Sequence, residues 1–259
     1  MQPVWNEPAL TFDRSDDEGK HRWLALSELH IGFESDLARK GAYLKSRSGV
    51  MADRILGLAE TTRSDHLLIL GDVKQRVAGT SAQERRDVPA FFERMSGFER
   101  VLIARGNHDV GLQELLPRQR FANVSIQPAT GLVIRGREGD VGALHGHAWP
   151  KPAVLRCDDV LVGHTHAAAR LIDEGGRATT EWAWARGRLD PTCVKAKYGR
   201  PLSPRIVVFP PFNPLLGGSP VNLEGLLGPM RRLVEESSLR LTLLDGRDLG
   251  KASARRRAR

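Results

Sequence analysis

The sequence has few cysteines and no long apolar run. Its two cysteines, Cys157 and Cys193, match no metal-binding motif and allow one disulfide at most. No apolar stretch approaches the length that spans a membrane, and residues 1–20 are acidic and polar without the apolar stretch of a signal peptide. These absences argue against a membrane protein and predict a location in the reducing cytoplasm.

The remaining composition is that of a globular protein with a basic end. The chain has 259 residues, of which 41% are hydrophobic and 27% charged, enough for one large domain. The net charge is +8, and leaving out the five Lys and Arg residues of segment 251–259 reduces it to +3. We therefore expect residues 1–250 to form one domain and 251–259 to be a disordered basic tail, which either binds nucleic acid or another polyanion or is only a solvated end.

Short apolar runs rich in β-branched residues predict buried strands. They occupy 23–27, 67–70, 101–104, 141–144 and 160–162. Between them, apolar residues at helical spacing predict helices over 36–63 and 84–95, with Pro89 either in the first turn or at a kink. The alternation of strands and helices is the α/β pattern.

The later part of the chain is richer in β-structure. Further strands are predicted at 132–135, 170–172, 179–184, 205–209 and 239–244. Asp173-Glu174-Gly175-Gly176 predicts a hairpin turn, and a helix is expected over 223–236. We therefore expect an α/β fold of two stacked mixed sheets flanked by helices.

Each of the five buried strands runs into a polar cluster. The clusters are Ser27-Glu28-Leu29-His30, Gly71-Asp72, Gly106-Asn107-His108-Asp109, His145-Gly146-His147 and Gly163-His164-Thr165-His166. They hold six of the eight histidines, and only His21 and His66 fall outside them. Ligand sites in open α/β sheets form beyond the carboxyl ends of strands, so these clusters are expected to converge.

The residue types in these clusters predict a metal site. Imidazoles, carboxylates and one amide suit Mn²⁺, Fe²⁺ or Zn²⁺. The candidate ligands are Glu28, His30, Asp72, Asn107, His145, His164 and His166. Seven ligands are too many for one ion, and a carboxylate can bridge two. Two ions roughly 3.5–4 Å apart are the usual device for in-line displacement at phosphorus.

In their order and spacing the clusters resemble the motifs of the calcineurin-like metallophosphoesterases. The resemblance implies a four-layer α/β/β/α sandwich. It also implies that the first metal is held by Glu28, His30 and His166, that the second is held by Asn107, His145 and His164, and that Asp72 bridges both. His108 would face the substrate as a general acid or a phosphate clamp.

Most of the chain, from about Trp23 to Gly250, is further similar to an archaeal group of phosphoesterases. The segments that carry this similarity are Gly71-Asp72-Val73-Lys74, His145-Gly146-His147-Ala148-Trp149-Pro150 and Phe212-Asn213-Pro214-Leu215. Lys74 and His147 are accordingly expected to contact the substrate, although His147 is also explained as a support of the ligands or a wall of the cleft. Asp109 is expected either to fix the tautomer of catalytic His108 or to cap a helix over 110–116.

Two positions depart from the family pattern. Glu28 replaces the usual aspartate, and its extra methylene is expected to weaken the first metal site unless the backbone shifts. Gln75 stands where a histidine is expected. Trp182 and Trp184, beside a basic segment, either stack on nucleic-acid bases or pack in the core.

The predicted function is hydrolysis of a phosphomonoester or phosphodiester, including nucleotides and nucleic acids, by a hydroxide that bridges two metal ions. Mn²⁺ is the first choice, with Fe²⁺, Zn²⁺ and Ni²⁺ as alternatives. The competing hypothesis is a binding or scaffold protein that keeps the phosphoesterase fold with a weakened site. Metal content distinguishes the two.

Overall fold

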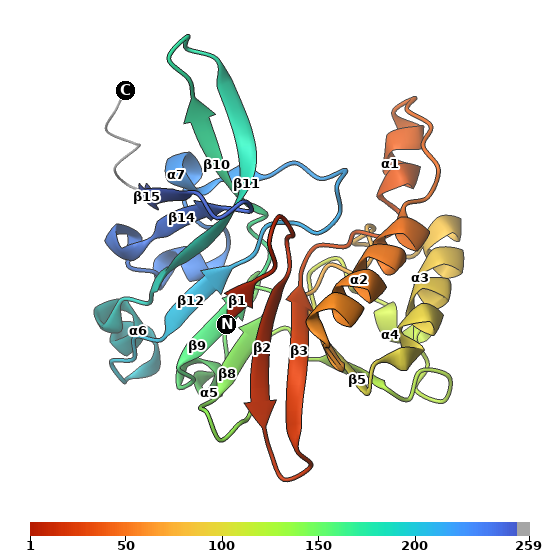
Figure 1. Cartoon of the computed structure of the whole chain (residues 1–259), viewed down its shortest axis with the longest axis horizontal. Helices are drawn as coiled ribbons and strands as arrows, with labels where there is room; N and C mark the ends of the chain where they lie inside the picture. The colour runs from red at the N-terminus through yellow and green to blue at the C-terminus, as the bar shows by residue number, and fades with distance from the viewer. Residues whose placement is uncertain (253–259) are drawn as a thin grey trace.

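Two mixed β-sheets lie face to face between two layers of helices in the computed structural model, which describes residues 1–252 (Figure 1). The first sheet has the strand order β1-β2-β3-β4-β5-β6. Its strands are β1 (Gln2–Pro3), β2 (Leu10–Ser15), β3 (Lys20–Leu26), β4 (His66–Ile69), β5 (Arg100–Ala104) and β6 (Val124–Gln127). Pairing is antiparallel from β1 to β3 and parallel from β3 to β6.

The second sheet has the strand order β13-β10-β11-β12-β9-β8-β7, and β14 joins it through β11 and carries β15. Its strands are β7 (Leu132–Ile134), β8 (Val141–Leu144), β9 (Asp159–Val162), β10 (Ala167–Ile172), β11 (Ala178–Arg188), β12 (Arg205–Val208), β13 (Ser219–Pro220), β14 (Arg240–Leu243) and β15 (Asp248–Lys251). Strands β8, β9 and β12 are parallel to one another. Both sheets therefore present a set of parallel strand ends at one edge.

Helices cover the outer faces of both sheets. Those on the first sheet are α1 (Phe33–Arg39), α2 (Ser48–Thr62), α3 (Ala82–Arg94) and α4 (Leu112–Leu115), and those of the second half are α5 (Pro152–Leu155), α6 (Pro191–Tyr198) and α7 (Val221–Glu224). Helix α3 starts with a capping box, in which Ser81 Oγ accepts the backbone N–H of Glu84 and the Glu84 carboxylate accepts that of Ser81.

Three apolar clusters fill the spaces between these layers. Along β3, Leu24 and Leu26 pack under the helices, whereas Trp23 and Ala25 face the second sheet. This alternation follows from the two-residue period of a strand that is buried on both faces. The third cluster lies between the second sheet and its own helices. The predicted α/β fold with two stacked mixed sheets is confirmed.

Two predicted helices are wrong in extent. The helix expected over 36–63 is two helices, α1 and α2, because Gly41 adopts a φ of 89° just after α1 and the chain does not return to helical geometry until Ser48. The helix expected over 223–236 is the short α7 followed by a 3₁₀ turn at Pro229–Arg232. Gly225 and Gly228 have φ of 75° and 62°, which an α-helix cannot contain.

Other expectations lie closer to the structure. The turn at Asp173–Gly176 joins β10 to β11, with the Gly176 N–H donated to the Asp173 carbonyl. Pro89 lies inside α3 rather than in its first turn. The expected tail begins with Lys251, the last residue of β15, and residues 253–259 lie outside the described part of the chain. No helix within residues 1–252 is long and apolar enough to cross a bilayer.

Candidate metal centre

The polar clusters follow parallel strands of both sheets and meet at one edge. Strands β3, β4 and β5 of the first sheet end at Leu26, Ile69 and Ala104, and β8 and β9 of the second end at Leu144 and Val162. The clusters open on a cavity of about 310 Å³. It is lined by His30, Asp72, Asn107, His108, His164, Thr165, His166, Gly217, Ser219 and Leu227. The expected convergence at the carboxyl ends of the strands is therefore present.

The first group of candidate ligands gathers around Glu28. Its Oε2 lies 3.0 Å from His30 Nε2 and 2.9 Å from His166 Nε2. Its Oε1 accepts hydrogen bonds from Ser27 Oγ at 2.9 Å and from the backbone N–H of His164 at 2.6 Å. The glutamate is fully buried. Oε2 of Glu28 thus faces two imidazoles, whereas Oε1 is fixed by hydrogen bonds from Ser27 and the His164 backbone.

The second group gathers around His145. Its Nε2 lies 3.2 Å from Asn107 Oδ1 and 3.1 Å from His164 Nδ1. Asp72, His145 and His164 can each offer a ligand atom within 4.8 Å of the others. These are the residues expected to share the second ion.

Asp72 lies between the two groups. Its Oδ2 is 3.5 Å from His30 Nε2 and 3.3 Å from His145 Nε2. Its Oδ1 points away and accepts the backbone N–H of His108 at 3.0 Å. A single oxygen atom therefore faces both groups, which is the geometry that a bridging ligand requires.

Hydrogen bonds to Nδ1 direct the Nε2 atoms of two histidines into the site. His145 Nδ1 lies 2.8 Å from the Leu70 carbonyl, and His30 Nδ1 lies 2.8 Å from Gln75 Oε1. Gln75 is itself held by Asp36, whose Oδ2 accepts from Gln75 Nε2 at 2.8 Å. Because a carbonyl or amide oxygen can only accept, the neutral imidazoles carry the proton on Nδ1 and leave Nε2 free to bind a metal. From the sequence, Gln75 was recognisable only as a departure from the family pattern, and its hydrogen bond to His30 could not be predicted.

The backbone of the ligand loops is strained. Five candidate ligands adopt left-handed φ values, namely Glu28 (60°), His30 (42°), Asp72 (51°), His164 (65°) and His166 (51°). Only Asn6 and Arg63 share this property among the other non-glycine residues described. Such strain costs of order 1–3 kcal/mol per residue and gathers where function demands a fixed geometry.

Gly106 and Gly163 have no room for a side chain, because their backbone packs directly against candidate ligands. A Cβ on Gly106 would overlap the Asp72 carboxylate, and a Cβ on Gly163 would lie 2.7 Å from the Leu70 carbonyl and 2.9 Å from Glu28 Oε1. Neither position can therefore accept a side chain without displacing a candidate ligand.

Burial and neighbouring charges shift the pKa values of several side chains in the site. Burial pushes the pKa of Glu28 upward, but His145 and the hydrogen bonds from His166 and His30 outweigh burial and hold this pKa well below its usual range. Burial lowers the pKa of His145, but Glu28 and Asp72 outweigh it and raise this pKa to about 9. Burial and the charge of His145 lower the pKa of His164 to about 4. Without metal, His145 is therefore a positively charged imidazolium at neutral pH, with a proton on both ring nitrogens, whereas His164 is a neutral imidazole.

Asp109 holds the loop of Asp72 rather than the ring of His108. Its buried carboxylate accepts backbone N–H groups from Asp72 at 3.0 Å, Val73 at 2.8 Å and Gly106 at 2.8 Å. Helix α4 begins three residues later and has Gly111 at its N-cap. Neither expected role of Asp109, orienting His108 or capping this helix, matches these partners. The carboxylate instead joins the two loops that carry Asp72 and Asn107.

Lys74 does not face the cavity. It is buried, and its Nζ donates to the backbone carbonyls of Arg76 and, at 3.1 Å, Gly79. Because these carbonyls lie in the loop between β4 and α3, the lysine holds that loop together. The expected substrate contact of Lys74 is therefore not supported by its position.

The other two histidines of the clusters lie beside the ligands. His108 has Nδ1 on the Gln75 carbonyl and Nε2 3.9 Å from Asp72 Oδ2, and it lines the cavity. The ring of His147 lies 5.2 Å from that of His145, and its buried Nδ1 has no hydrogen-bond partner among the described residues. Both rings thus lie beside candidate ligands.

The tryptophans have different environments. Trp184 is buried between the sheets, with its ring 4.8 Å from that of Phe209, so its place is in the core. Trp182 on the same strand is half-buried and lines a separate surface hollow. Neither residue lines the cavity of the candidate metal centre.

Comparison with known proteins gives a match in structure only. No family model and no curated protein matches the sequence. The crystal structure of nuclease MPE from Pseudomonas putida is similar at a TM-score of 0.55 and 16% identity, over 93% of this chain and 100% of that chain. The chain has the fold of this nuclease.

Two further structures are more distant. The phosphoesterase YfcE from E. coli has a TM-score of 0.38 and 18% identity, over 58% of this chain and 73% of that chain. Vps29 from Entamoeba histolytica, complexed with Zn²⁺, has a TM-score of 0.34 and 14% identity, over 76% of this chain and 80% of that chain. At these scores neither adds to the assignment of the fold, and the similarity to an archaeal group stays a prediction.

Proposed function

We propose that the chain is a phosphoesterase that uses two divalent metal ions. The observation that carries this proposal is the position of Asp72 Oδ2, at 3.5 Å from His30 Nε2 and 3.3 Å from His145 Nε2. Asp72 Oδ1 accepts the backbone N–H of His108, so only Oδ2 is left to contact both groups of candidate ligands. Hydrogen bonding by itself would not require five left-handed backbone conformations among these residues.

The donor set fits a pair of divalent ions. Glu28, His30 and His166 would hold the first ion, and Asn107, His145 and His164 the second, with Asp72 shared. Imidazole, carboxylate and amide donors suit Mn²⁺ first, and Fe²⁺, Zn²⁺ or Ni²⁺ as alternatives. When bound, such a pair supplies a hydroxide nucleophile at neutral pH and polarises the phosphoryl oxygens.

The protein's own residues then position the reaction. Asp72 and Asn107 lie on two loops that Asp109 joins, so a buried carboxylate fixes the proposed bridging ligand relative to a ligand of the second ion. His108 turns Nε2 toward the same cavity while its Nδ1 is held by the Gln75 carbonyl. Because the Gln75 carbonyl accepts the N–H of His108 Nδ1, Nε2 is the nitrogen left to donate a proton to the leaving oxygen.

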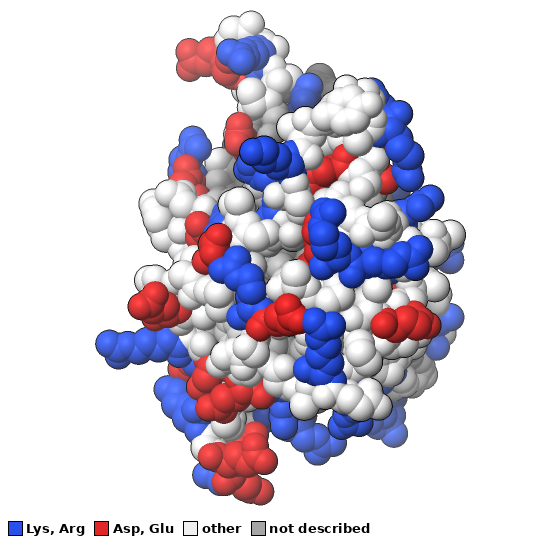
Figure 2. All heavy atoms as spheres, turned by 90° about the vertical axis from the view of Figure 1, so that its right-hand side faces the viewer, with Lys and Arg blue, Asp and Glu red and all other residues white. Residues whose placement is uncertain are grey.

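We further propose a phosphodiester of nucleic acid as the substrate. The structure of similar fold is a nuclease. Figure 2 shows Lys and Arg mixed with Asp and Glu on the helix-bearing side of the molecule, so a polyanion is expected to bind at the cavity edge rather than over that face. Both sheets supply ligands, and we propose that residues 1–250 act as one catalytic domain to which a basic tail adds only affinity for nucleic acid.

The test measures metal content and hydrolysis together. Purified protein loaded with Mn²⁺ is assayed on bis(4-nitrophenyl) phosphate, 4-nitrophenyl phosphate and DNA, and the bound metal is counted by mass spectrometry. We expect about two Mn²⁺ ions per chain, hydrolysis of the diesters, and loss of Mn²⁺ and of most activity in Asp72→Asn. Asp17→Asn, in an exposed turn, is the matched control. A chain that binds no metal and hydrolyses none of the substrates would favour the scaffold hypothesis instead.

A further inference from the structure

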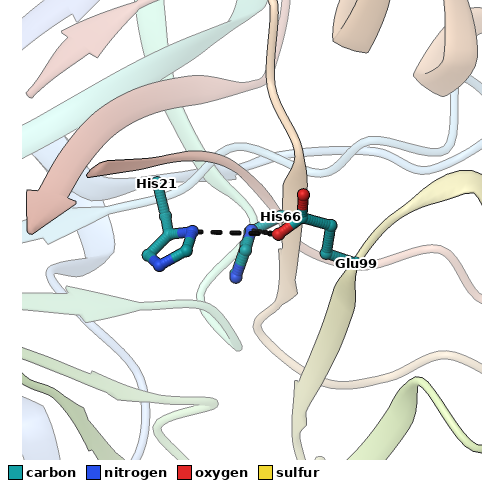
Figure 3. Close-up of side chains that lie close together, drawn as sticks. All are labelled: His21, His66 and Glu99. Atoms are coloured by element: carbon teal, nitrogen blue, oxygen red, sulfur yellow. Dashed lines mark ion pairs between the residues drawn. The ribbon is translucent and has the colours of Figure 1, made fainter. Parts of the chain in front are cut away.

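The two histidines that lie outside the candidate metal centre come together elsewhere. His21 is in β3 and His66 begins β4, and their ring centroids lie 4.5 Å apart (Figure 3). Glu99 directly precedes β5 and points its carboxylate toward both rings. All three residues stand at the starts of neighbouring strands, whereas the candidate metal centre lies beyond the ends of the same strands. The two clusters are therefore at opposite edges of the first sheet.

The three side chains have the spacing of metal ligands. Glu99 Oε2 lies 3.8 Å from His21 Nδ1 and 4.0 Å from His66 Nδ1, and one ligand atom of each residue falls within 4.8 Å of the others. Ligands at about 2.0–2.1 Å from a tetrahedral ion lie roughly 3.3–3.5 Å from one another. The Glu99 side chain is 65% exposed, so its rotation can close the remaining gap.

The surroundings of His21 prepare it for a metal. Its Nε2 lies 3.1 Å from Asp16 Oδ1, so the imidazole has a carboxylate partner on the side away from Glu99. A carboxylate on one ring nitrogen holds the tautomer whose other nitrogen carries a free lone pair, the arrangement found behind metal-bound histidines. His21 Nδ1 is that free nitrogen.

His66 is held in place by its neighbours. Its ring is buried and packs edge-on against Trp23 at 4.6 Å. Asp65 Oδ1 lies 2.7 Å from His66 Nδ1, so a metal ion that replaced the proton between them would have Asp65 as a fourth donor, the second oxygen of the set.

We propose that His21, His66 and Glu99 bind a structural Zn²⁺ ion, with Asp65 or water as the fourth ligand. Nitrogen and carboxylate donors in a four-coordinate set are typical of zinc. The ion links the starts of β3, β4 and β5, and it thereby stabilises the edge of the sheet opposite the candidate metal centre. This site is independent of the proposed hydrolysis.

The test replaces Glu99, the exposed proposed ligand, because this substitution leaves the hydrophobic core intact. The full chain and its Glu99→Gln variant are loaded with Zn²⁺, freed of excess metal and analysed for zinc per chain. We expect Glu99→Gln to lose one zinc ion while keeping its phosphodiesterase rate. Glu174→Gln, which removes another exposed acid, from the β10–β11 turn, should keep the zinc content of the unmodified chain.

Two further measurements separate this site from the candidate metal centre. In an Asp72→Asn background, Co²⁺ should still give the visible absorption of a tetrahedral site, and His21→Gln should abolish it. Zn²⁺ should raise the Tm of Asp72→Asn but not that of Asp72→Asn combined with Glu99→Gln. Equal zinc content in the unmodified chain and Glu99→Gln, or a Co²⁺ spectrum unaffected by His21→Gln, would overturn the proposal.

Discussion

The carboxylate of Asp109 accepts the backbone N–H of Asp72, with Oδ2 at 3.0 Å from the nitrogen. The same oxygen accepts the N–H of Gly106, at 2.8 Å. Asp109 thus joins the loop after β4 to the loop after β5, and it does so from a fully buried position. The first of these loops carries the proposed bridging ligand and the second carries Asn107.

Asp109→Asn is expected to destabilise the fold and disturb the site together. An amide has only one acceptor atom and would turn its NH₂ toward backbone N–H groups, so we expect a loss of about 2–4 kcal/mol in the free energy of unfolding. Urea denaturation and metal analysis measure the two effects, with Asp17→Asn as the control. A variant that keeps its stability and metals but loses activity would show that Asp109 acts through His108 after all.

Glu28→Asp is expected to weaken the first metal group. The family pattern suggests that the shorter aspartate would suit the site, but here both glutamate oxygens are engaged, by His30 and His166 on one side and by Ser27 on the other. A carboxylate one methylene shorter cannot keep all of these contacts. We expect the affinity for Mn²⁺ to fall roughly 10–100-fold, measured by calorimetric titration. Unchanged or tighter binding would show that the loops readily adapt to aspartate.

His108→Ala is expected to slow hydrolysis without loss of metal. His108 Nε2 is 3.9 Å from the proposed bridging oxygen and faces the cavity, so it is placed to protonate a leaving group. We expect the rate to fall by roughly 10²–10⁴ on DNA and less on a nitrophenyl ester, whose leaving group needs little protonation. His108→Asn can still donate to the Gln75 carbonyl and separates positioning from proton transfer. Loss of a metal ion in His108→Ala would instead make this residue a ligand.

Metal binding is expected to release protons near neutral pH. The pKa of His145 is raised to about 9, above its usual value of 6.5, so its proton stabilises the metal-free fold at low pH and that contribution is lost as the pH rises through about 9. A metal at Nε2 must displace this proton, so the apparent affinity should rise up to roughly tenfold per pH unit toward pH 9. Calorimetry at about pH 7.5, in buffers of different ionisation heat, counts the protons released. A count near zero would contradict the raised pKa.

Local patterns in the sequence were sufficient to predict the parallel strands and the polar loops at their carboxyl ends. Strands β4 and β8, and the last residues of β3, β5 and β9, are short, apolar and buried, which leaves a clear signal in the sequence. The residues after each strand then had to meet, because parallel strands end at a common edge. For this reason the seven candidate ligands could be named before their distances were known.

Partners that are distant in sequence were decided only by the tertiary structure. Lys74 donates to backbone carbonyls, and Asp109 accepts from backbone N–H groups. A buried charged group has no contact with water, so it must form hydrogen bonds with the polar groups that the packed loops place beside it. The encounter of His21 with His66 depends on the pairing of β3 with β4, which sets residues far apart in the chain beside each other. The sequence pattern indicates where each strand ends. Which residues from distant parts of the chain contact one another depends on strand register and loop packing.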